Sequence, residues 1–253
     1  MKVTFLGTGT SQGVPLINCH CQVCTSADKK NHRLRSSISV ETDQATVIID
    51  TTPDLRQQLL RNPLPRIDAV LYTHAHADHI YGIDDLRRFN QLQKERIPVY
   101  GDASVINRLT RMFDYAFGDG DLNPGLPNLK AVRVDGTFSI NNLAVIPVTL
   151  MHGQQEIRGF RIGKMAYCTD VSYIPEKIFK QLENLDVLIL DALREKEHPT
   201  HFSVAEAVAA AQRIAAGKTY FIHMSHKIEH QAASRKLPKN MFFSYDGLTL
   251  NLP

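Results

Sequence analysis

Short apolar runs alternate along the chain with stretches in which apolar residues recur at helical spacing. Runs of this length, bounded by polar or turn-forming residues, predict buried β-strands. At 253 residues, 43% of them hydrophobic, the chain can bury a large core, and we expect a single domain over residues 1–253. The clearest strand candidates are Lys2–Leu6, Val47–Ile49, Ala69–Tyr72, Leu143–Leu150, Met165–Thr169 and Thr219–Ile222.

Local signals predict four helices. Ser203 and Glu206 form a capping box that opens an alanine-rich helix, which we expect Gly217 to close. Pro53 predicts the first position of another helix. Three leucines are expected on its buried face: Leu55, Leu59 and Leu60. Asp102 and Pro175 precede two surface helices expected over Ala103–Phe117 and Glu176–Leu182.

Charge and hydropathy exclude several classes of protein. The 29 Lys and Arg residues nearly balance the 26 Asp and Glu residues, so the net charge of +3 does not indicate a general nucleic-acid binder. No apolar run approaches the length of a membrane span, and no basic segment followed by a long apolar one opens the sequence. We therefore expect a cytoplasmic protein with no membrane partner and no stable nucleic-acid partner.

The densest chemistry lies in Thr73–His79, directly after an apolar run. His74 and His76 are two residues apart and share a side in an extended segment, whereas Asp78 and His79 fall where the chain turns into the next element. Three imidazoles and one carboxylate suit zinc, manganese or iron, and a pair of such ions can activate water near neutral pH. The motif therefore predicts a dinuclear metal site.

Further donors stand at the tips of other predicted strands. His152, Asp170 and His223 each follow an apolar run, as Asp50 does after Val47–Ile49. Taken singly, each is more often a structural residue than a ligand. Together with the histidine-rich motif they complete a set of ligands for two ions.

A second cluster, Cys19, Cys21 and Cys24, predicts a structural zinc site. A reducing cytosol disfavours disulfides, and three thiols leave one unpaired, whereas three thiolates and one imidazole form a closed tetrahedral site. We expect His226 to be the fourth ligand. The alternative is a loop of reduced cysteines, and the competing ligands are His20, His32 and His230.

The ordered motifs resemble the metallo-beta-lactamase superfamily of metal-dependent hydrolases. The resemblance implies an α/β fold, the four-layer αββα sandwich, with metals at one edge of the sheets. It also implies that Asp170 and a hydroxide bridge the two metals, and that Asp50 supports the ligands. The implied ligands are His74, His76 and His152 for one metal, and Asp78, His79 and His223 for the other.

The segment Cys19–Cys24 after an opening Gly-Thr-Gly loop is similar to the PhnP-like phosphodiesterases. That resemblance implies the structural zinc with His226 and a catalytic histidine at the position of His201. It also implies hydrolysis of small phosphodiesters, especially cyclic ones such as ribose cyclic phosphates or 2',3'-cyclic nucleotides, and suggests a homodimer. His201 would be the general acid, and Asp78 belongs to the catalytic set. The active-site metals could be zinc, manganese, iron or nickel.

Some residues keep no assigned role. His198 is the rival of His201 as general acid, and either could be a solvent-exposed loop histidine. Gln12 stands where a G-x-G-x-x-G motif needs its third glycine, so we reject a dinucleotide site. Four arginines could bind phosphate, although such charges are usually solvated surface: Arg33, Arg35, Arg87 and Arg88.

Three other functions stay open. Transfer-RNA 3'-processing endonucleases share the histidine motif but need a basic arm, and we find no insertion of that kind. Thioester or lactam hydrolysis would use the same metals without His201. A non-catalytic binding or accessory module is disfavoured, because folding alone does not require so many buried ionisable groups.

Overall fold

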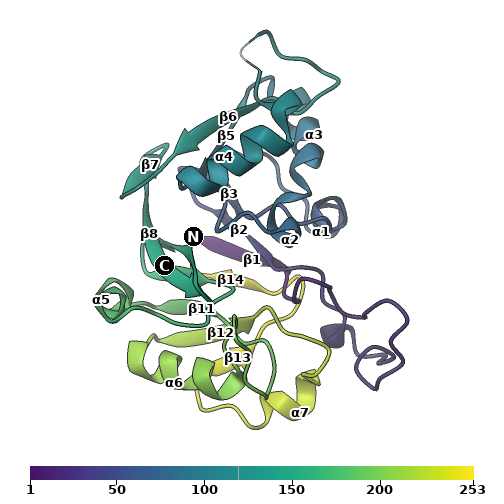
Figure 1. Cartoon of the computed structure of the whole chain (residues 1–253), viewed down its shortest axis with the longest axis vertical. Helices are drawn as coiled ribbons and strands as arrows, with labels where there is room; N and C mark the ends of the chain where they lie inside the picture. The colour runs from purple at the N-terminus through teal and green to yellow at the C-terminus, as the bar shows by residue number, and fades with distance from the viewer. Residues whose placement is uncertain (119) are drawn as a thin grey trace.

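Two mixed sheets pack face to face between two layers of helices (Figure 1), in a computed structural model that describes residues 1–118 and 120–253. The expected four-layer α/β sandwich is confirmed. In the first sheet the strand order is β14-β1-β2-β3-β4-β5-β6, and in the second it is β13-β12-β11-β10-β9-β8-β7.

The first sheet combines an antiparallel and a parallel half. Strands β3 to β6 are parallel, whereas β1 pairs antiparallel with β2 and with β14. Its strands are β1 (Lys2–Gly7), β2 (Ser37–Glu41), β3 (Thr46–Ile49), β4 (Ala69–Leu71), β5 (Ile97–Gly101), β6 (Leu129–Arg133) and β14 (Thr249–Asn251).

The second sheet has the same division. Strands β10 to β13 are parallel, and β7, β8, β9 and β10 pair antiparallel in turn. Its strands are β7 (Phe138–Ile140), β8 (Leu143–His152), β9 (Gln155–Ile162), β10 (Met165–Cys168), β11 (Val187–Asp191), β12 (Lys218–Ile222) and β13 (Met241–Phe243). The predicted strands are therefore confirmed, with shifts of a few residues at their ends.

The helices cover the outer faces of the sheets (Figure 1). Against the first sheet lie α1 (Leu55–Arg61), α2 (Ala77–Ile80), α3 (Arg87–Gln93) and α4 (Ala103–Met112), and against the second lie α5 (Glu176–Phe179), α6 (Val204–Ile214) and α7 (His230–Ser234). Short 3-10 turns are η1 (Lys29–Asn31), η2 (Ile83–Leu86), η3 (Asp114–Ala116) and η4 (Lys180–Leu182). None of the helices in the described part of the chain is long and apolar enough to cross a membrane.

Alternating side chains divide the strands between three cores. On β3, Val47 and Ile49 face the second sheet, whereas Ile48 faces the helices. On β11, Ile189 lies between the sheets, and its neighbours Leu188 and Leu190 pack under α5 and α6. Because both faces of these strands are buried, their sequences are almost continuously apolar.

All four helix predictions need correction. The helices expected over Ala103–Phe117 and Glu176–Leu182 end at Met112 and Phe179, and a 3-10 turn follows each of them. The helix expected from Pro53 begins at Leu55. Leu60, expected on the buried face, is 64% exposed, because it lies about 100° round the helix from Leu59. The capping box of Ser203 is confirmed. Helix α6 ends at Ile214, because the next residue, Ala215, takes a left-handed conformation. Gly217 does not close the helix. A Cβ there would lie 2.9 Å from the carbonyl oxygen of Asp186, so glycine allows this close approach instead.

Candidate metal centre

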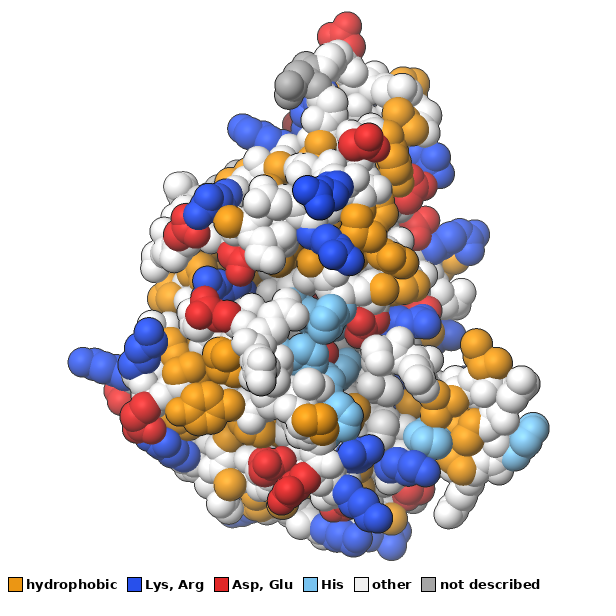
Figure 2. Space-filling model, viewed as in Figure 1, with side chains coloured by type: hydrophobic (Ala, Val, Ile, Leu, Met, Phe, Trp, Pro, Cys, Tyr) orange, Lys and Arg blue, Asp and Glu red, His pale blue; other side chains and the backbone are white. Residues whose placement is uncertain are grey.

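The carboxyl ends of the central strands bring the predicted donors to one edge of the sandwich. Asp50 and His223 directly follow β3 and β12, and Asp170 lies two residues after the end of β10. All three have left-handed φ values, of 64° for Asp50, 58° for Asp170 and 63° for His223. A left-handed turn costs a non-glycine residue about 1 kcal/mol, and Asp and His tolerate it better than most. Histidine side chains gather near the middle of the face in Figure 2, with basic and hydrophobic side chains around them.

The first group of donors consists of His74, His76 and His152. Their ligand atoms lie within 4.8 Å of one another. The Nε2 atom of His74 is 3.0 Å from Nδ1 of His76. The Nδ1 atom of His152 donates to the carbonyl oxygens of Thr200 and Asp170 at 2.8 and 3.0 Å, which leaves its Nε2 atom free for a metal.

The second group consists of Asp78, His79, Asp170 and His223. The two oxygens of Asp170 face different imidazoles: Oδ2 is 3.3 Å from Nε2 of His79, and Oδ1 is 3.4 Å from Nε2 of His223. Within the described residues, neither Nε2 atom has a hydrogen-bond partner, although both are buried. Buried imidazole nitrogens left unpaired and aimed at carboxylates fit a divalent cation between them.

Carboxylates behind the ligands make the site attractive to cations. The Nδ1 atom of His79 donates to Oδ2 of Asp50 at 2.7 Å, and Thr73 donates to both oxygens of that carboxylate. Burial alone would lower the pKa of His79, but Asp78, Asp170 and Asp50 together raise it well above the ordinary value. The same negative charge would favour a divalent cation beside His79.

His201 stands over this site with a carboxylate behind it. Its Nδ1 atom donates to Oδ2 of Asp191 at 3.0 Å, and its ring centroid is 4.7 Å from those of His152 and His223. Burial would lower the pKa of His201, but the charge and hydrogen bond of Asp191, with the charges of Asp170 and Asp78, raise it to about 9. The imidazolium can therefore donate a proton at neutral pH.

Asp191 had no role in the prediction from sequence. It is fully buried at the end of β11, and its Oδ2 atom also accepts from the backbone N–H of Val171 at 3.1 Å. Its Oδ1 atom lies 3.5 Å from Nδ1 of His223. The same pattern of a buried strand with a donor at its tip that marked Asp170 was present here, and it would have found Asp191.

The rival histidine lies near His201 but is held differently. The ring of His198 is 5.2 Å from that of His201, and its Nδ1 atom accepts from the hydroxyl of Thr200 at 3.2 Å. Burial, followed by the positive charge of His201, lowers the pKa of His198. His198 is therefore the poorer proton donor of the two.

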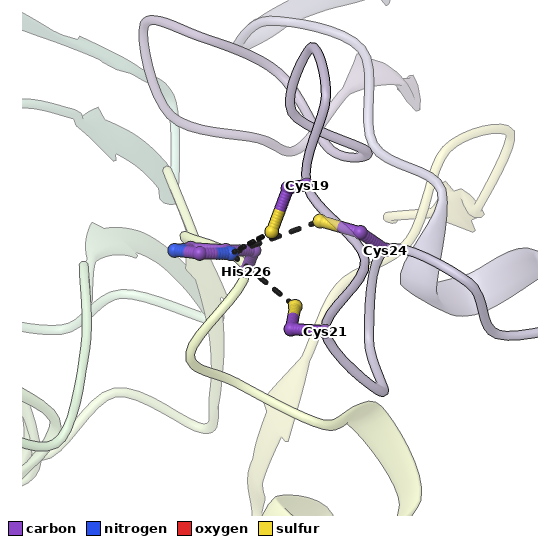
Figure 3. Close-up of side chains that lie close together, drawn as sticks. All are labelled: Cys19, Cys21, Cys24 and His226. Carbon is purple, nitrogen blue, oxygen red and sulfur yellow. Dashed lines mark hydrogen bonds between the residues drawn. The ribbon is translucent and has the colours of Figure 1, made fainter.

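The three cysteines converge on His226 from a part of the chain about 200 residues away (Figure 3). Its Nδ1 atom is 3.4, 3.4 and 3.7 Å from the sulfurs of Cys19, Cys21 and Cys24. Tetrahedral zinc with ordinary bond lengths separates a sulfur and a nitrogen ligand by about 3.6 Å. The four side chains therefore fit zinc.

Hydrogen bonds and burial give the thiols of this cluster different pKa values. The backbone N–H of Cys24, with smaller effects from side-chain hydrogen bonds, lowers the pKa of Cys21 to about 6, whereas burial raises that of Cys24 to about 11.

The competing histidines lie outside the cluster. His32 bonds the carbonyl oxygen of Ser26, and the groups of possible ligands in the described chain do not include His20 or His230.

All four arginines already have partners within the protein. Arg35 pairs with Asp54, Arg87 with Asp84 and Arg88 with Gln91, and Arg33 is buried beside the thiolate cluster. The structure therefore assigns none of them to phosphate binding.

The sandwich and its edge of imidazole and carboxylate donors define a metal-dependent hydrolase of the metallo-beta-lactamase fold. The family "Beta-lactamase superfamily domain" matches residues 45–224, and the chain belongs to this superfamily. A new diphosphatase from the PhnP family has a solved structure with 42% sequence identity and a TM-score of 0.92, covering 98% of this chain and 96% of that one. The PhnP-like resemblance is thereby confirmed.

Two other relatives place the chain more broadly. An octanoyltransferase from Porphyromonas gingivalis is 37% identical over 253 residues, which are 98% of this chain but 51% of that protein. The chain therefore spans about half the length of this curated relative. Zn(2+)-bound PqqB from Methylobacterium extorquens shares the fold, with 22% identity, a TM-score of 0.81 and complete coverage of both chains.

Proposed function

We propose that this hydrolase is a dinuclear metal-dependent phosphodiesterase that acts on small phosphodiesters, especially cyclic ones. The observation that carries the proposal is the pair His201–Asp191, which sets a protonated imidazole beside the seven metal donors. An ester of phosphoric acid with an alcohol needs such an acid, because the departing alkoxide is strongly basic. The similarity to a PhnP-family diphosphatase supports phosphate chemistry.

The residues divide the work of hydrolysis between them. Two divalent cations held by the seven donors would activate water and neutralise charge on the phosphoryl oxygens. Asp50, Thr73 and the carbonyl of Thr200 hold the ligand imidazoles in orientation. As water adds to phosphorus and the ester P–O bond breaks, His201 donates its proton to the leaving oxygen. Asp191 keeps that imidazole charged. Because Asp191 binds Nδ1, the Nε2 atom of His201 is left as the proton donor.

The test compares two diesters that differ in their need for an acid. Bis(p-nitrophenyl) phosphate releases a stable phenolate, whereas a 2',3'-cyclic nucleotide releases an alkoxide. With manganese or zinc added, His201→Ala should lose about 10²- to 10⁴-fold in kcat on the cyclic nucleotide and less on the aryl diester. His198→Ala is the matched control and should stay near wild type. Metal content is measured for each variant.

Two outcomes would contradict the proposal. Wild type that is loaded with metal yet cleaves neither diester would not be a phosphodiesterase of this kind. Loss of activity in His198→Ala but not in His201→Ala would exchange their roles. Retained metals in His201→Ala are needed to attribute its defect to proton donation.

A second candidate is hydrolysis of an acyl thioester, favoured by the similarity to an octanoyltransferase that carries this domain within a longer chain. A thiolate leaves without protonation, so His201→Ala should then retain activity. Octanoyl thioesters tested beside the two diesters separate the candidates.

A further inference from the structure

Arg33 is buried beside the thiolate cluster, with 1% of its surface exposed. A buried guanidinium is costly unless its N–H groups are bonded. It donates to the carbonyl oxygens of Ser225 and Ile228 at 3.0 and 2.9 Å, and to Oδ1 of Asn31 at 3.2 Å. Two of these three acceptors belong to the loop that carries His226.

That loop belongs to both metal sites. His223 begins it as a donor of the dinuclear centre, and His226 lies three residues later in the thiolate cluster. Between them, Met224 donates to the carbonyl oxygen of Thr8 at 3.0 Å and accepts from the N–H of Thr10 at 3.2 Å. Arg33 binds the carbonyl of Ser225, which is the residue directly before His226.

The backbone of Arg33 meanwhile holds the cysteine segment. Its N–H donates to the carbonyl oxygen of Val14 at 2.7 Å, and its own carbonyl accepts from the N–H of Val14 at 2.8 Å. Val14 packs with Val23 and Cys24 in a small apolar cluster. One residue therefore contacts both halves of the thiolate site, its backbone on the cysteine side and its side chain on the histidine side.

We propose that Arg33 is a positioning residue that couples the two metal sites. It fixes the cysteine segment against the loop from His223 to His226, so that zinc on the thiolates orders His223 for its own metal. Coupling of this kind is reciprocal, and occupancy of either site strengthens the other. The proposal concerns metal binding and holds whichever ester the enzyme hydrolyses.

The first experiment measures zinc affinity at the thiolate site by chelator competition, with the thiolate charge-transfer absorption of bound Co²⁺ as the signature of that site. Arg33→Met should bind about 10- to 100-fold more weakly than wild type. Arg33→Lys should recover part of the loss, because an ammonium reaches fewer of the three acceptors. Arg35→Met is the matched control: Arg35 bonds Asp54 and the carbonyl of Ser11, and it should leave zinc affinity unchanged.

An unchanged zinc affinity in Arg33→Met, measured in a folded protein, would overturn the positioning role. Equal losses in Arg33→Met and Arg35→Met would do the same, since they would report general destabilisation. If Arg33→Met does not fold, the zinc affinity of Arg33→Lys is compared with that of wild type, and an unchanged affinity would overturn the positioning role.

The second experiment uses the wild type and tests the coupling directly. Manganese binds poorly to thiolates and well to imidazole and carboxylate, so its affinity at the dinuclear centre can be followed by electron paramagnetic resonance. With one equivalent of zinc on the thiolates, manganese should bind at least about fivefold more tightly than without it. Equal manganese affinities in the two states would refute the coupling, and this readout does not depend on any catalytic activity.

Discussion

Replacing Asp191 by Asn removes one charge behind His201 and should give a defect that depends on pH. The side chain keeps its shape, and its oxygen can still accept from His201 and from the N–H of Val171, which both use Oδ2 in the wild type. Asp191 provides the largest of the effects that raise the pKa of His201 to about 9. Without it, we expect that pKa to return to about 6.5, the ordinary value for imidazole.

The size of the defect follows from the protonated fraction of His201. At pH 8 a pKa of about 9 leaves about 90% of the imidazole protonated, whereas a pKa of about 6.5 leaves about 3%. The variant should therefore lose about 30-fold in kcat at pH 8. At pH 6 both fractions exceed about 70%, so the loss should fall below about twofold. The direction of the pH dependence follows from the raised pKa, which keeps His201 protonated to higher pH. Asp191→Asn should lower the pH above which the proton is lost.

The assay measures kcat on a 2',3'-cyclic nucleotide from pH 6 to pH 8.5, beside bis(p-nitrophenyl) phosphate and the metal content. The aryl diester should show a smaller defect at every pH, because its leaving group needs no proton. A loss that is constant with pH would refute this reasoning. It would indicate that Asp191 acts through the orientation of His223, whose Nδ1 atom is 3.5 Å from Oδ1 of Asp191.

Three further predictions concern stability, measured by urea unfolding. Leu55→Ala should cost about 2–5 kcal/mol in the core under α1, whereas Leu60→Ala at its exposed position should stay within about 0.5 kcal/mol; equal losses would contradict the assigned faces. Burial raises the pKa of Asp246 to about 7, so the folded state binds this proton more tightly than the unfolded state does. The free energy of unfolding of the wild type, relative to that of Asp246→Asn, should therefore fall by about 2–3 kcal/mol from pH 5 to pH 8. A pH-independent difference would exclude that cause. Gly82→Ala should cost more than about 2 kcal/mol, because its Cβ would clash with the backbone carbonyl oxygen of Thr52. Gly136→Ala meets no atom within 4 Å and should be near neutral, so similar losses in the two variants would contradict the steric argument.

The sequence predicted the strands from runs with few polar residues, and in β3 both faces of the run are buried. Runs such as Val47–Ile49 and Leu143–Leu150 have few polar positions, and their ends are marked by the first donors that follow. Helix faces were less predictable. In the seven-residue helix α1, leucines at 55 and 59 face the core while Leu60 faces solvent, and apolarity alone does not separate them.

The roles of single charged residues depend on contacts that no local pattern contains. Arg33 stands in a polar segment that suggests surface, yet it is buried because the carbonyls of Ser225 and Ile228 arrive from about 190 residues away. The pairing of His226 with the cysteines likewise spans about 200 residues, and the sequence alone left His20, His32 and His230 as competing ligands. Asp191, in contrast, carried a local signal that was not used.

The left-handed conformations of Asp50, Asp170 and His223 show how the fold carries the strain of placing metal donors at the ends of strands. Each turn costs about 1 kcal/mol, and each follows a strand that is buried in the sandwich. Hydrogen bonds also hold the backbone directly after two of these donors. The N–H of the residue after Asp170 donates to Asp191, and that of the residue after His223 donates to the carbonyl oxygen of Thr8. Packing of the sheets and these bonds offset the strain at the three donors. Any order that the fold provides at these donors lowers the ordering cost of metal binding, which then gains affinity.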